Sequence, residues 1–446
     1  MPVPNNATGL WPSASLGETP RFCSGVRGRV RISRGDRVVL RALAEKVREL
    51  CFRDFEAEKR QLWDSHNALM PQRPLILADP ENGWNEIIPT SALKCRGELA
   101  RRWEFVLRRE IFCGESLKDD RPIEPVFEIG HTYRESGWGV EEVYHGGSGG
   151  RSYIWEAAIR APEDIEKLEA PMLEVDQQTT LGTLALAEEV LGDILRVCIR
   201  GVWWWSLGMT LSLSKLVGLE NLFLYFYDNP RLLHRLMAFL RDTTLARLDY
   251  LEENRLLSLN NNHSYVGSGG LGYSRELPRE TVNQEKQSEP SGVMTSDLWG
   301  FTESQETIGV SAGMFEEFVF RYQQPIQARF GLNCYGCCEP LDGRWNVVRK
   351  TPNLRRVSVS PWADQDKMAS FLEDRYIFSR KPSPSALAVP RLNEEAVRRD
   401  IEETLEMTRG CVVELIMKDN HTLGHNPGNL INWVRVAREE VDRLYG

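Results

Sequence analysis

RVSVSPWADQDKMASFLEDRYIFS, residues 356–379, combines two kinds of hydrophobic pattern in one short segment. Residues 356–360 and 376–379 are runs of apolar and small residues that favour strands, and residues 365–372 have apolar side chains at helical spacing. A strand–helix–strand order requires parallel pairing, because the chain must cross back over the sheet before the second strand begins. The segment therefore predicts one unit of a parallel α/β sheet.

The same alternation extends in both directions along the chain. Seven strands are identifiable in all, and an eighth is expected near Trp203 or within residues 266–299. This repetition predicts an α/β fold of the (β/α)8 TIM-type barrel class rather than an open doubly wound sheet. The remaining strands are predicted at residues 74–79, 195–202, 256–260, 331–335 and 411–417, and the main helices at residues 229–254, 314–330, 393–409 and 427–444.

Three regions are expected along the chain. Residues 1–33 begin with a segment rich in Pro, Ser, Asn and Gly and are predicted to be a mobile tail. Residues 34–160 form a helical N-terminal extension with the first strand, a helix over residues 34–70, and a glycine-rich β-excursion over residues 123–153. Residues 161–446 are predicted to hold the main part of the barrel.

Composition narrows the class of protein. The 446 residues carry a net charge of −9, with a pI of about 5.5, and no basic stripe that would contact nucleic-acid phosphates. No apolar run approaches the ~20 residues of a membrane span, and Met1–Pro20 lacks the features of a secretory signal. Nine cysteines without such a signal predict reduced thiols and a cytoplasmic location.

A cluster of thiols lies in residues 331–341, GLNCYGCCEPL, which contain Cys334, Cys337 and Cys338 followed by Glu339. Thiols at the end of a strand suit either soft-metal binding or nucleophilic sulfur chemistry. We expect zinc to be bound by Cys337, Cys338 and His421, with one coordination position left for a substrate. The alternative is that the cysteines are small buried hydrophobes and that His421 is an ordinary loop histidine.

Other candidate site residues follow the predicted strands, because barrel enzymes carry their active sites at the carboxyl ends of the strands. Glu306, Asp364 and Lys418 are candidates for proton transfer or orientation. Further polar residues at strand ends, together with one residue of an aromatic run, are candidates for substrate binding: Trp204, Asn262, His263, Gln305, Arg380 and Lys381. Each of these residues taken singly is also explained by packing or by an ordinary polar loop.

Several segments resemble the uroporphyrinogen decarboxylase superfamily, which includes zinc-dependent cobamide methyltransferases on the same barrel. SLGMTLSLSKLVGLENLFLYFYDNP resembles the family's glycine-rich turn and the helix after it, and SQETIGVSAGMFEEFVFRYQQPI resembles the segment before its cysteine strand. SRKPSPSALA and IMKDNHTLGHNPGNLINWVRVARE resemble its last two strand ends and its closing helix. The resemblance covers roughly Asp36 to the C-terminus and is specific for the superfamily rather than for a reaction.

The chain departs from the family where the chemistry would lie. The methyltransferases carry His-x-Cys-Gly as zinc ligands, and here Asn333 and Tyr335 stand at the His and Cys positions. We assign Asn333 and Tyr335 to substrate binding for this reason. The third family ligand, a cysteine after the last strand, is replaced by Asn420 or His421. The N-terminal arginine motif of the decarboxylase is not recognisable.

The resemblance implies an enzyme that is methyltransferase-like or demethylase-like. It would act on a small methylated compound, such as a methoxyl or methylamine compound, and pass the methyl group to a separate corrinoid protein or a thiol. Two alternatives stay open, a metal-free decarboxylase in which Arg380, Lys381 and Lys418 hold carboxylates, and a barrel that binds a ligand without catalysis. The resemblance is also compatible with a homodimer.

Overall fold

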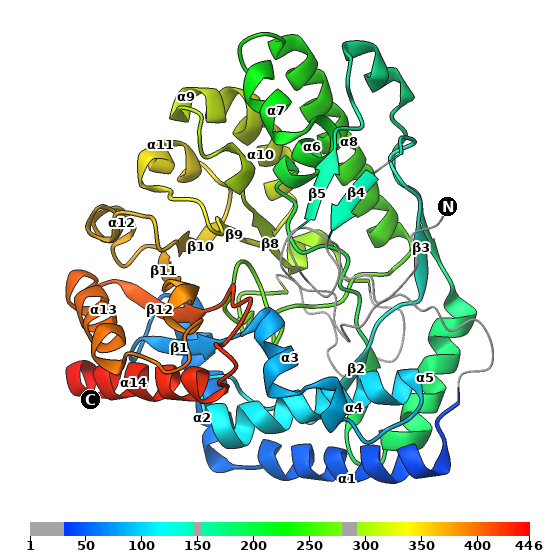
Figure 1. Ribbon diagram of the computed structural model, residues 1–446, viewed down its shortest axis with the longest axis vertical. Helices are drawn as coiled ribbons and strands as arrows, with labels where there is room; N and C mark the ends of the chain where they lie inside the picture. Colours follow the sequence, from blue (N-terminus) through cyan, green and yellow to red (C-terminus); the bar gives the residue numbers. More distant parts are fainter. Residues whose placement is uncertain (1–30, 142, 147–152, 279–291) are drawn as a thin grey trace.

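The computed structural model describes residues 31–141, 143–146, 153–278 and 292–446, and its centre is a parallel sheet (Figure 1). Residues 1–30 of the expected tail lie outside the described part of the chain, as do residues 279–291 of the region expected to hold the eighth strand. The sheet has six strands, and all of its pairings are parallel. Their order is β1 (Leu75–Ala78), β12 (Val412–Met417), β11 (Ile377–Arg380), β10 (Leu354–Val359), β9 (Leu332–Tyr335) and β8 (Trp299–Thr302).

Helices connect the consecutive strands from β8 to β12, as the alternating pattern predicts. They follow one another around the outer side of the sheet in chain order (Figure 1). The helix predicted over residues 314–330 is present, but a π-helical turn at Glu316–Phe320 interrupts it and Pro325 lies inside its last part. The connecting helices are α9 (Ala312–Phe315), α10 (Arg321–Gln327), α11 (Trp345–Val348), α12 (Gln365–Leu372) and α13 (Glu394–Met407), and α14 (Gly428–Tyr445) closes the chain.

A second parallel pair lies outside this sheet, formed by β2 (Val126–Ile129) and β7 (Arg196–Ile199). The strand expected at residues 256–260 is absent from the described ladders. Residues of this segment accept hydrogen bonds from Gly201 and Trp203 instead. Ser258 Oγ accepts from Gly201 N at 2.9 Å, and Leu256 O accepts from the Trp203 indole N–H at 2.8 Å. The result is a mixed α/β fold with a central parallel sheet, consistent with a TIM-like fold, and the ladders of the described residues do not show a closed barrel.

Two helices replace the single helix expected over residues 34–70. They are α1 (Arg34–Cys51) and α2 (Asp54–Asn67), and the extended backbone of Arg53 separates them, with φ −71° and ψ 140°. The following strand, β1, pairs with β12, so the N-terminal extension contributes a strand to the same sheet as the last part of the chain. The other helices are α3 (Trp84–Ile87), α4 (Glu98–Phe112), α5 (Gln177–Leu191), α6 (Thr210–Val217), α7 (Leu219–Tyr225) and α8 (Pro230–Glu253).

The β-excursion was expected over residues 123–153, of which residues 142 and 147–152 lie outside the described part of the chain. The described residues of this region take part in two antiparallel pairs, one of which is completed by a strand beyond the expected end. The pairs are β3 (Tyr133–Glu135) with β6 (Leu173–Val175) and β4 (Val143–Gly146) with β5 (Tyr153–Glu156). None of the helices in the described residues has the length and apolar character needed to cross a membrane.

A glycine-rich hairpin, residues 264–274, packs against the inner side of the central sheet. Its two arms are joined by hydrogen bonds from Val266 N to Gly270 O and from Gly272 N to Ser264 O, at 3.1 and 2.9 Å. Gly267 has a positive φ of 67°, and a Cβ there would lie 2.9 Å from Cys334 Sγ. Only glycine allows this close approach, which brings the tip of the hairpin to the strand ends.

Candidate active site

Reactive side chains gather at the carboxyl edge of the central sheet. Glu303 follows β8, Cys337 lies just beyond β9, and Lys418 follows β12. Parallel strands end at the same edge, so side chains far apart in sequence are brought together there. All three are buried, with 1%, 3% and 3% of their surface exposed, respectively.

Three groups surround the thiol of Cys337. Cys338 Sγ lies 3.5 Å from its Sγ, Ser268 Oγ at the tip of the hairpin lies at 3.2 Å, and Lys418 Nζ lies at 4.0 Å. The hydrogen bond from Cys338, followed by the charge of Lys418, outweighs burial and lowers the pKa of Cys337. This edge therefore favours the thiolate form of Cys337, which is the nucleophilic form.

Lys418 supplies the positive charge. Its Nζ lies 2.6 Å from Asp419 Oδ1 and 3.4 Å from Glu81 Oε1. Burial opposes the ammonium, but the Cys337 thiolate and the two carboxyl groups outweigh burial and raise the pKa of Lys418 well above its usual value. The pKa of Glu81 is raised to about 7, mainly by burial and further by the negative charges of the neighbouring Asp419 and Asp79. Lys418 is therefore a permanent cation beside the thiolate.

Cys338 is the more accessible member of the thiol pair. Its side chain is half-buried, and its Sγ lies 3.6 Å from Asp419 Oδ2. The hydrogen bond to Cys337 raises the pKa of Cys338, so the outer thiol holds its proton more strongly than the inner one.

Three carboxyl groups form the other half of the edge. Burial is the first cause that raises the pKa of Glu303, Glu306 and Glu339, and for Glu303 the increase is large because Glu306 and Glu339 add to it. Ser206 Oγ donates to Glu303 Oε1 at 3.1 Å, and Thr210 Oγ1 donates to Glu306 Oε2 at 2.6 Å. A buried acid of raised pKa holds its proton near neutral pH and can deliver it to a leaving group.

Glu339 has a positioning role as well. Its two oxygens accept from the backbone N–H groups of Ser304 and Cys337, each at 2.9 Å. It therefore joins the loop after β8 to the loop after β9 and fixes Glu303 and Cys337 relative to each other.

Lys381, after β11, is a second buried amine with different chemistry. Its Nζ donates to Ser379 Oγ at 2.5 Å and to Ser379 O at 3.1 Å. Burial lowers its pKa to about 8, the charge of Lys418 and that of Arg356 contribute to this lowering, and Glu414 opposes it. A lysine of this kind is neutral in a larger fraction of molecules than Lys418, which has three anionic neighbours.

The predicted catalytic residues divide into two groups. Glu306 and Lys418 lie in the cluster described above. Asp364 is exposed and caps helix α12, where its carboxylate accepts from Lys367 N at 3.1 Å and pairs with Lys367 Nζ at 2.8 Å. The contacts of Asp364 are those of a helix cap.

The predicted zinc ligands are only partly brought together. Cys337 and Cys338 are neighbours, but the side chain of His421 is exposed and its Nδ1 lies 3.2 Å from Asn82 Nδ2. No group of three or more His, Cys, Asp or Glu side chains in the described part of the chain is arranged to hold a metal ion. The zinc set predicted from the sequence does not fit this arrangement.

Most of the predicted substrate-binding residues have contacts that account for them without a ligand. The Asn333 amide donates to the carbonyls of Gln327 and Pro352, and the Tyr335 hydroxyl donates to Gln323 Oε1 at 2.9 Å. Gln305 follows Glu303 and donates its backbone N–H to that carboxyl at 3.0 Å. The remaining contacts are those of Arg380 with the Ser360 carbonyl, Trp204 with the Phe330 ring, Asn262 with Ser264 N, and His263 with Glu128.

Four members of the edge are not among the predicted site residues, namely Ser268, Glu81, Glu303 and Asp419. Asp419 stands next to Lys418 at the end of a predicted strand, so the strand-end rule applies to it. Glu303 follows β8, a strand that was not identified from the sequence, so the rule could not point to it. Ser268 carries no such signal, because its place depends on the hairpin that packs inside the sheet.

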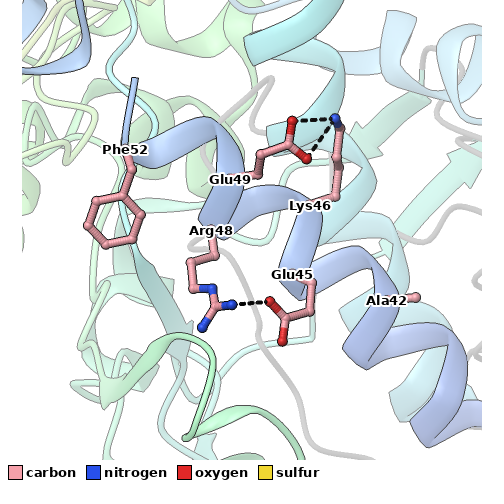
Figure 2. Close-up of a pocket in the computed structure, with 6 residues that line it drawn as sticks. All are labelled: Ala42, Glu45, Lys46, Arg48, Glu49 and Phe52. Carbon is pink, nitrogen blue, oxygen red and sulfur yellow. Dashed lines mark hydrogen bonds and ion pairs between the residues drawn. The ribbon is translucent and has the colours of Figure 1, made fainter. Parts of the chain in front are cut away.

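A surface depression of about 530 Å³ lies on helix α1 and is lined by residues of that helix and by Phe52 at its end (Figure 2). Its charged groups pair with each other, Arg48 with Glu45 at 2.7 Å and Lys46 with Glu49 at 3.0 Å. None of the thiol, lysine or carboxyl groups of the strand ends lines it. The depression therefore belongs to the solvated face of one helix.

No family model matches the chain, and no curated protein matches it. Among solved structures, the chain is similar to a methyltransferase from Methanosarcina mazei at 11% sequence identity, with a TM-score of 0.47. The match covers 87% of this chain and 98% of that one. A similarity of this degree carries no conclusion about the reaction, and membership of the uroporphyrinogen decarboxylase superfamily stays a prediction.

Proposed function

We propose that the protein is a methyltransferase-like enzyme that moves a methyl group from a small methoxyl or methylamine compound to the thiolate of Cys337. The observation that carries the proposal is the buried Cys337 thiol, which has Lys418 Nζ at 4.0 Å and a lowered pKa. Activated thiolates beside a fixed cation are nucleophiles for covalent group transfer. The neutral carboxyl of Glu303 at the same edge supports the proposal, because a methoxyl leaving group needs a proton.

The transfer step is a displacement at the methyl carbon. A sulfur–carbon bond forms at Cys337 while the bond from carbon to oxygen or nitrogen breaks, and the electron pair leaves with the heteroatom. The Glu303 carboxyl donates its proton to that atom and is reprotonated from solvent. The products are a methyl thioether on Cys337 and the demethylated compound. A separate corrinoid protein or an external thiol, the acceptors expected from the family resemblance, would then take the methyl group from this position.

The test is to search for the methyl group on the protein. Full-length protein is incubated with a set of methoxyarenes and methylamines, and peptides are mapped by mass spectrometry. We expect one methyl group on Cys337 in the wild type and none in Cys337→Ser. Cys411→Ser is the matched control, because Cys411 is a half-buried thiol immediately before β12 and lies outside the cluster. Folded wild type that neither acquires the methyl group nor releases a demethylated product from any donor would overturn the proposal.

A second candidate is metal-free decarboxylation, which the buried lysines favour. Lys381 and Lys418 are cations that suit a carboxylated substrate, and neutral Glu303 could protonate the carbanion left when CO2 departs. This candidate requires Cys337→Ser to stay active in CO2 release and Lys381→Met to lose activity. Methyl transfer predicts the opposite response to Cys337→Ser, so one variant separates the two reactions.

A further inference from the structure

The two adjacent thiols of Cys337 and Cys338 have a geometry that methyl transfer does not require. Their sulfur atoms lie 3.5 Å apart, and the outer sulfur lies 3.6 Å from a carboxylate oxygen of Asp419. Cys337 is 3% exposed, whereas Cys338 is half-buried and adjoins the surface. A nucleophilic thiol with a second thiol in contact is the arrangement in which oxidation ends in a disulfide rather than in a higher oxide.

We propose that Cys337 and Cys338 are a reversible oxidation site, in which a hydroperoxide converts the pair to a disulfide. The site shares its thiolate with the proposed function but needs no methyl donor, so each can fail without the other. Disulfide formation would remove the nucleophile from Cys337 and separate it from Lys418.

The oxidation proceeds in two balanced steps. The Cys337 thiolate attacks the hydroperoxide, a sulfur–oxygen bond forms as the oxygen–oxygen bond breaks, and the departing alkoxide or hydroxide takes a proton from water. Cys338 then gives its proton to Asp419 and attacks the sulfur of the sulfenic acid. The sulfur–sulfur bond forms as the sulfur–oxygen bond breaks, and the hydroxide leaves as water with that proton. The overall change is two thiols and one hydroperoxide to one disulfide, one alcohol or water, and one water.

Reversibility follows from the covalent geometry of neighbouring residues. Adjacent Cα atoms are about 3.8 Å apart across a trans peptide, which is below the usual span of about 4.4 Å or more between disulfide-linked residues. A disulfide at this position is strained, and strained disulfides are reduced more easily than structural ones. The pair therefore suits a switch that a cytoplasmic thiol reductant resets.

Two other cysteines provide internal references. Cys198 and Cys411 are both more exposed than Cys337, and burial raises the pKa of each to about 11. The pKa of Cys337 is lowered instead, by its hydrogen bond with Cys338 and by the charge of Lys418, so it has the larger thiolate fraction of the three. With a second thiol in contact as well, we expect Cys337 to be oxidised about tenfold faster than either reference, in spite of its burial.

The experiment exposes folded full-length protein to hydrogen peroxide and follows each cysteine by differential alkylation and peptide mass spectrometry. Wild type should lose two alkylatable thiols, at Cys337 and Cys338, and regain both with dithiothreitol. In Cys338→Ser the oxidation should stop at a sulfenic acid on Cys337, which dimedone traps. Cys411→Ser should behave as wild type, and circular dichroism before treatment confirms that each variant is folded.

Two results would overturn the inference. One is that Cys337 and Cys338 stay alkylatable at a peroxide dose that oxidises Cys198 or Cys411. The other is that wild type accumulates sulfinic acid on Cys337 without a disulfide. Wild type itself separates this inference from the proposed function, because methylation and oxidation are followed in separate incubations. Methylation of Cys337 together with no disulfide would remove only the oxidation site, and a reversible disulfide without methylation by any donor would remove only the methyl transfer.

Discussion

Two clusters of buried charged groups lie on the central sheet, and they have opposite chemistry. In the first, Glu414 on β12 lies 2.9 Å from Arg356 Nε on β10 and 3.2 Å from His66 Nε2 on α2. Burial would raise the pKa of Glu414, but Arg356 and His66 outweigh it and lower the pKa to about 2. In the second, at the carboxyl edge, Glu303 has carboxyl groups for neighbours and its pKa is raised. Burial acts to raise the pKa of the carboxyl group at both places, and the charges of its neighbours decide whether the group is ionised or protonated.

This difference separates a structural cluster from a reactive one. Around Glu414 each charge has an opposite charge within contact, and the Asn67 side chain accepts from Arg356 at 2.6 Å. At the carboxyl edge, a single permanent ammonium, Lys418, faces a thiol and two carboxyl groups. Groups held in unusual protonation states are available for proton transfer and nucleophilic attack. The variants below test whether the two clusters respond as this comparison requires.

The largest effect is expected for Glu414→Ala. It leaves the buried guanidinium of Arg356 without its carboxylate, and unpaired buried charges of this kind cost about 3–5 kcal/mol of unfolding free energy. Urea unfolding followed by circular dichroism measures the loss. The double variant Arg356→Met/Glu414→Leu is the control, because replacing both charges by apolar groups should recover much of the stability. A single variant that loses less than about 1 kcal/mol would show that the pair is not buried as described.

The next effect concerns Lys381 and is a dependence of stability on pH. Its pKa is lowered from 10.5 to about 8 in the folded protein. Between these values the unfolded chain holds a proton that the folded protein lacks, so the unfolding free energy rises with pH in this interval. The contribution of Lys381 to that rise is up to about 3 kcal/mol, and it is absent below about pH 8.

The Lys381→Met variant isolates this contribution. Other groups titrate in both proteins, so the difference in unfolding free energy between wild type and variant is the quantity to follow from pH 7 to 10.5. We expect the unfolding free energy of wild type to rise steadily relative to that of the variant above about pH 8. A difference that is constant over the whole range would mean that Lys381 titrates normally and is solvated.

The third effect is kinetic and concerns Lys418. Lys418→Met removes the cation beside Cys337, so the pKa of that thiol should rise. If the pKa rises by one, alkylation of Cys337 by iodoacetamide at pH 7 should slow about tenfold, because the thiolate fraction falls by that factor. The pH–rate profile of Cys337 should move to higher pH, a change that loss of packing alone would not produce. Lys418→Arg keeps the charge and should retain most of the reactivity. Identical profiles for wild type and Lys418→Met would assign the low pKa to Cys338 and Ser268 alone.

Part of the fold was predictable because its strands are short runs dominated by apolar and small residues. The runs at residues 331–335, 356–360 and 411–417 carry one charged residue at most, and each forms a strand of the central sheet. The β8 strand was not identified, since it contains Gly300, a residue type that disfavours strands. Gly300 packs against Phe330, and a Cβ at this position would lie 2.5 Å from Phe330 Cγ. Residues 256–260 had the composition of a strand without forming its ladder. Both errors have the same cause. Whether a segment forms a strand depends on the neighbouring strand with which it pairs, and local composition does not encode that neighbour.

The site was predictable to the extent that the strand-end rule applies. Lys418 directly follows β12, and Cys337 comes two residues after β9, with its Sγ 4.0 Å from Lys418 Nζ. Glu306 comes four residues after β8 and contributes to the raised pKa of Glu303 at the same edge. His421 stands only three residues beyond Lys418, but the loop turns its side chain toward Asn82 and away from the thiols. Ser268 reaches Cys337 through a hairpin from a distant part of the chain. Distance along the sequence after a strand therefore identifies the edge of the sheet but not the direction of a side chain.

The smallest effect is expected for Asp364→Ala, which tests the boundary of the reactive cluster. Asp364 follows a strand as the reactive residues do, but it is exposed, and its carboxylate accepts from Lys367 N at the start of α12. Its pKa is lowered, first by the hydrogen bond from Lys367. Loss of the cap should lower the urea midpoint slightly, and Asp364→Asn should restore it, because asparagine also caps helices well. The alkylation rate of Cys337 and its pH profile should be the same in all three proteins. A change in that profile would place Asp364 within the reactive cluster and would remove the distinction between residues that merely end a strand and residues that are buried at the edge of the sheet.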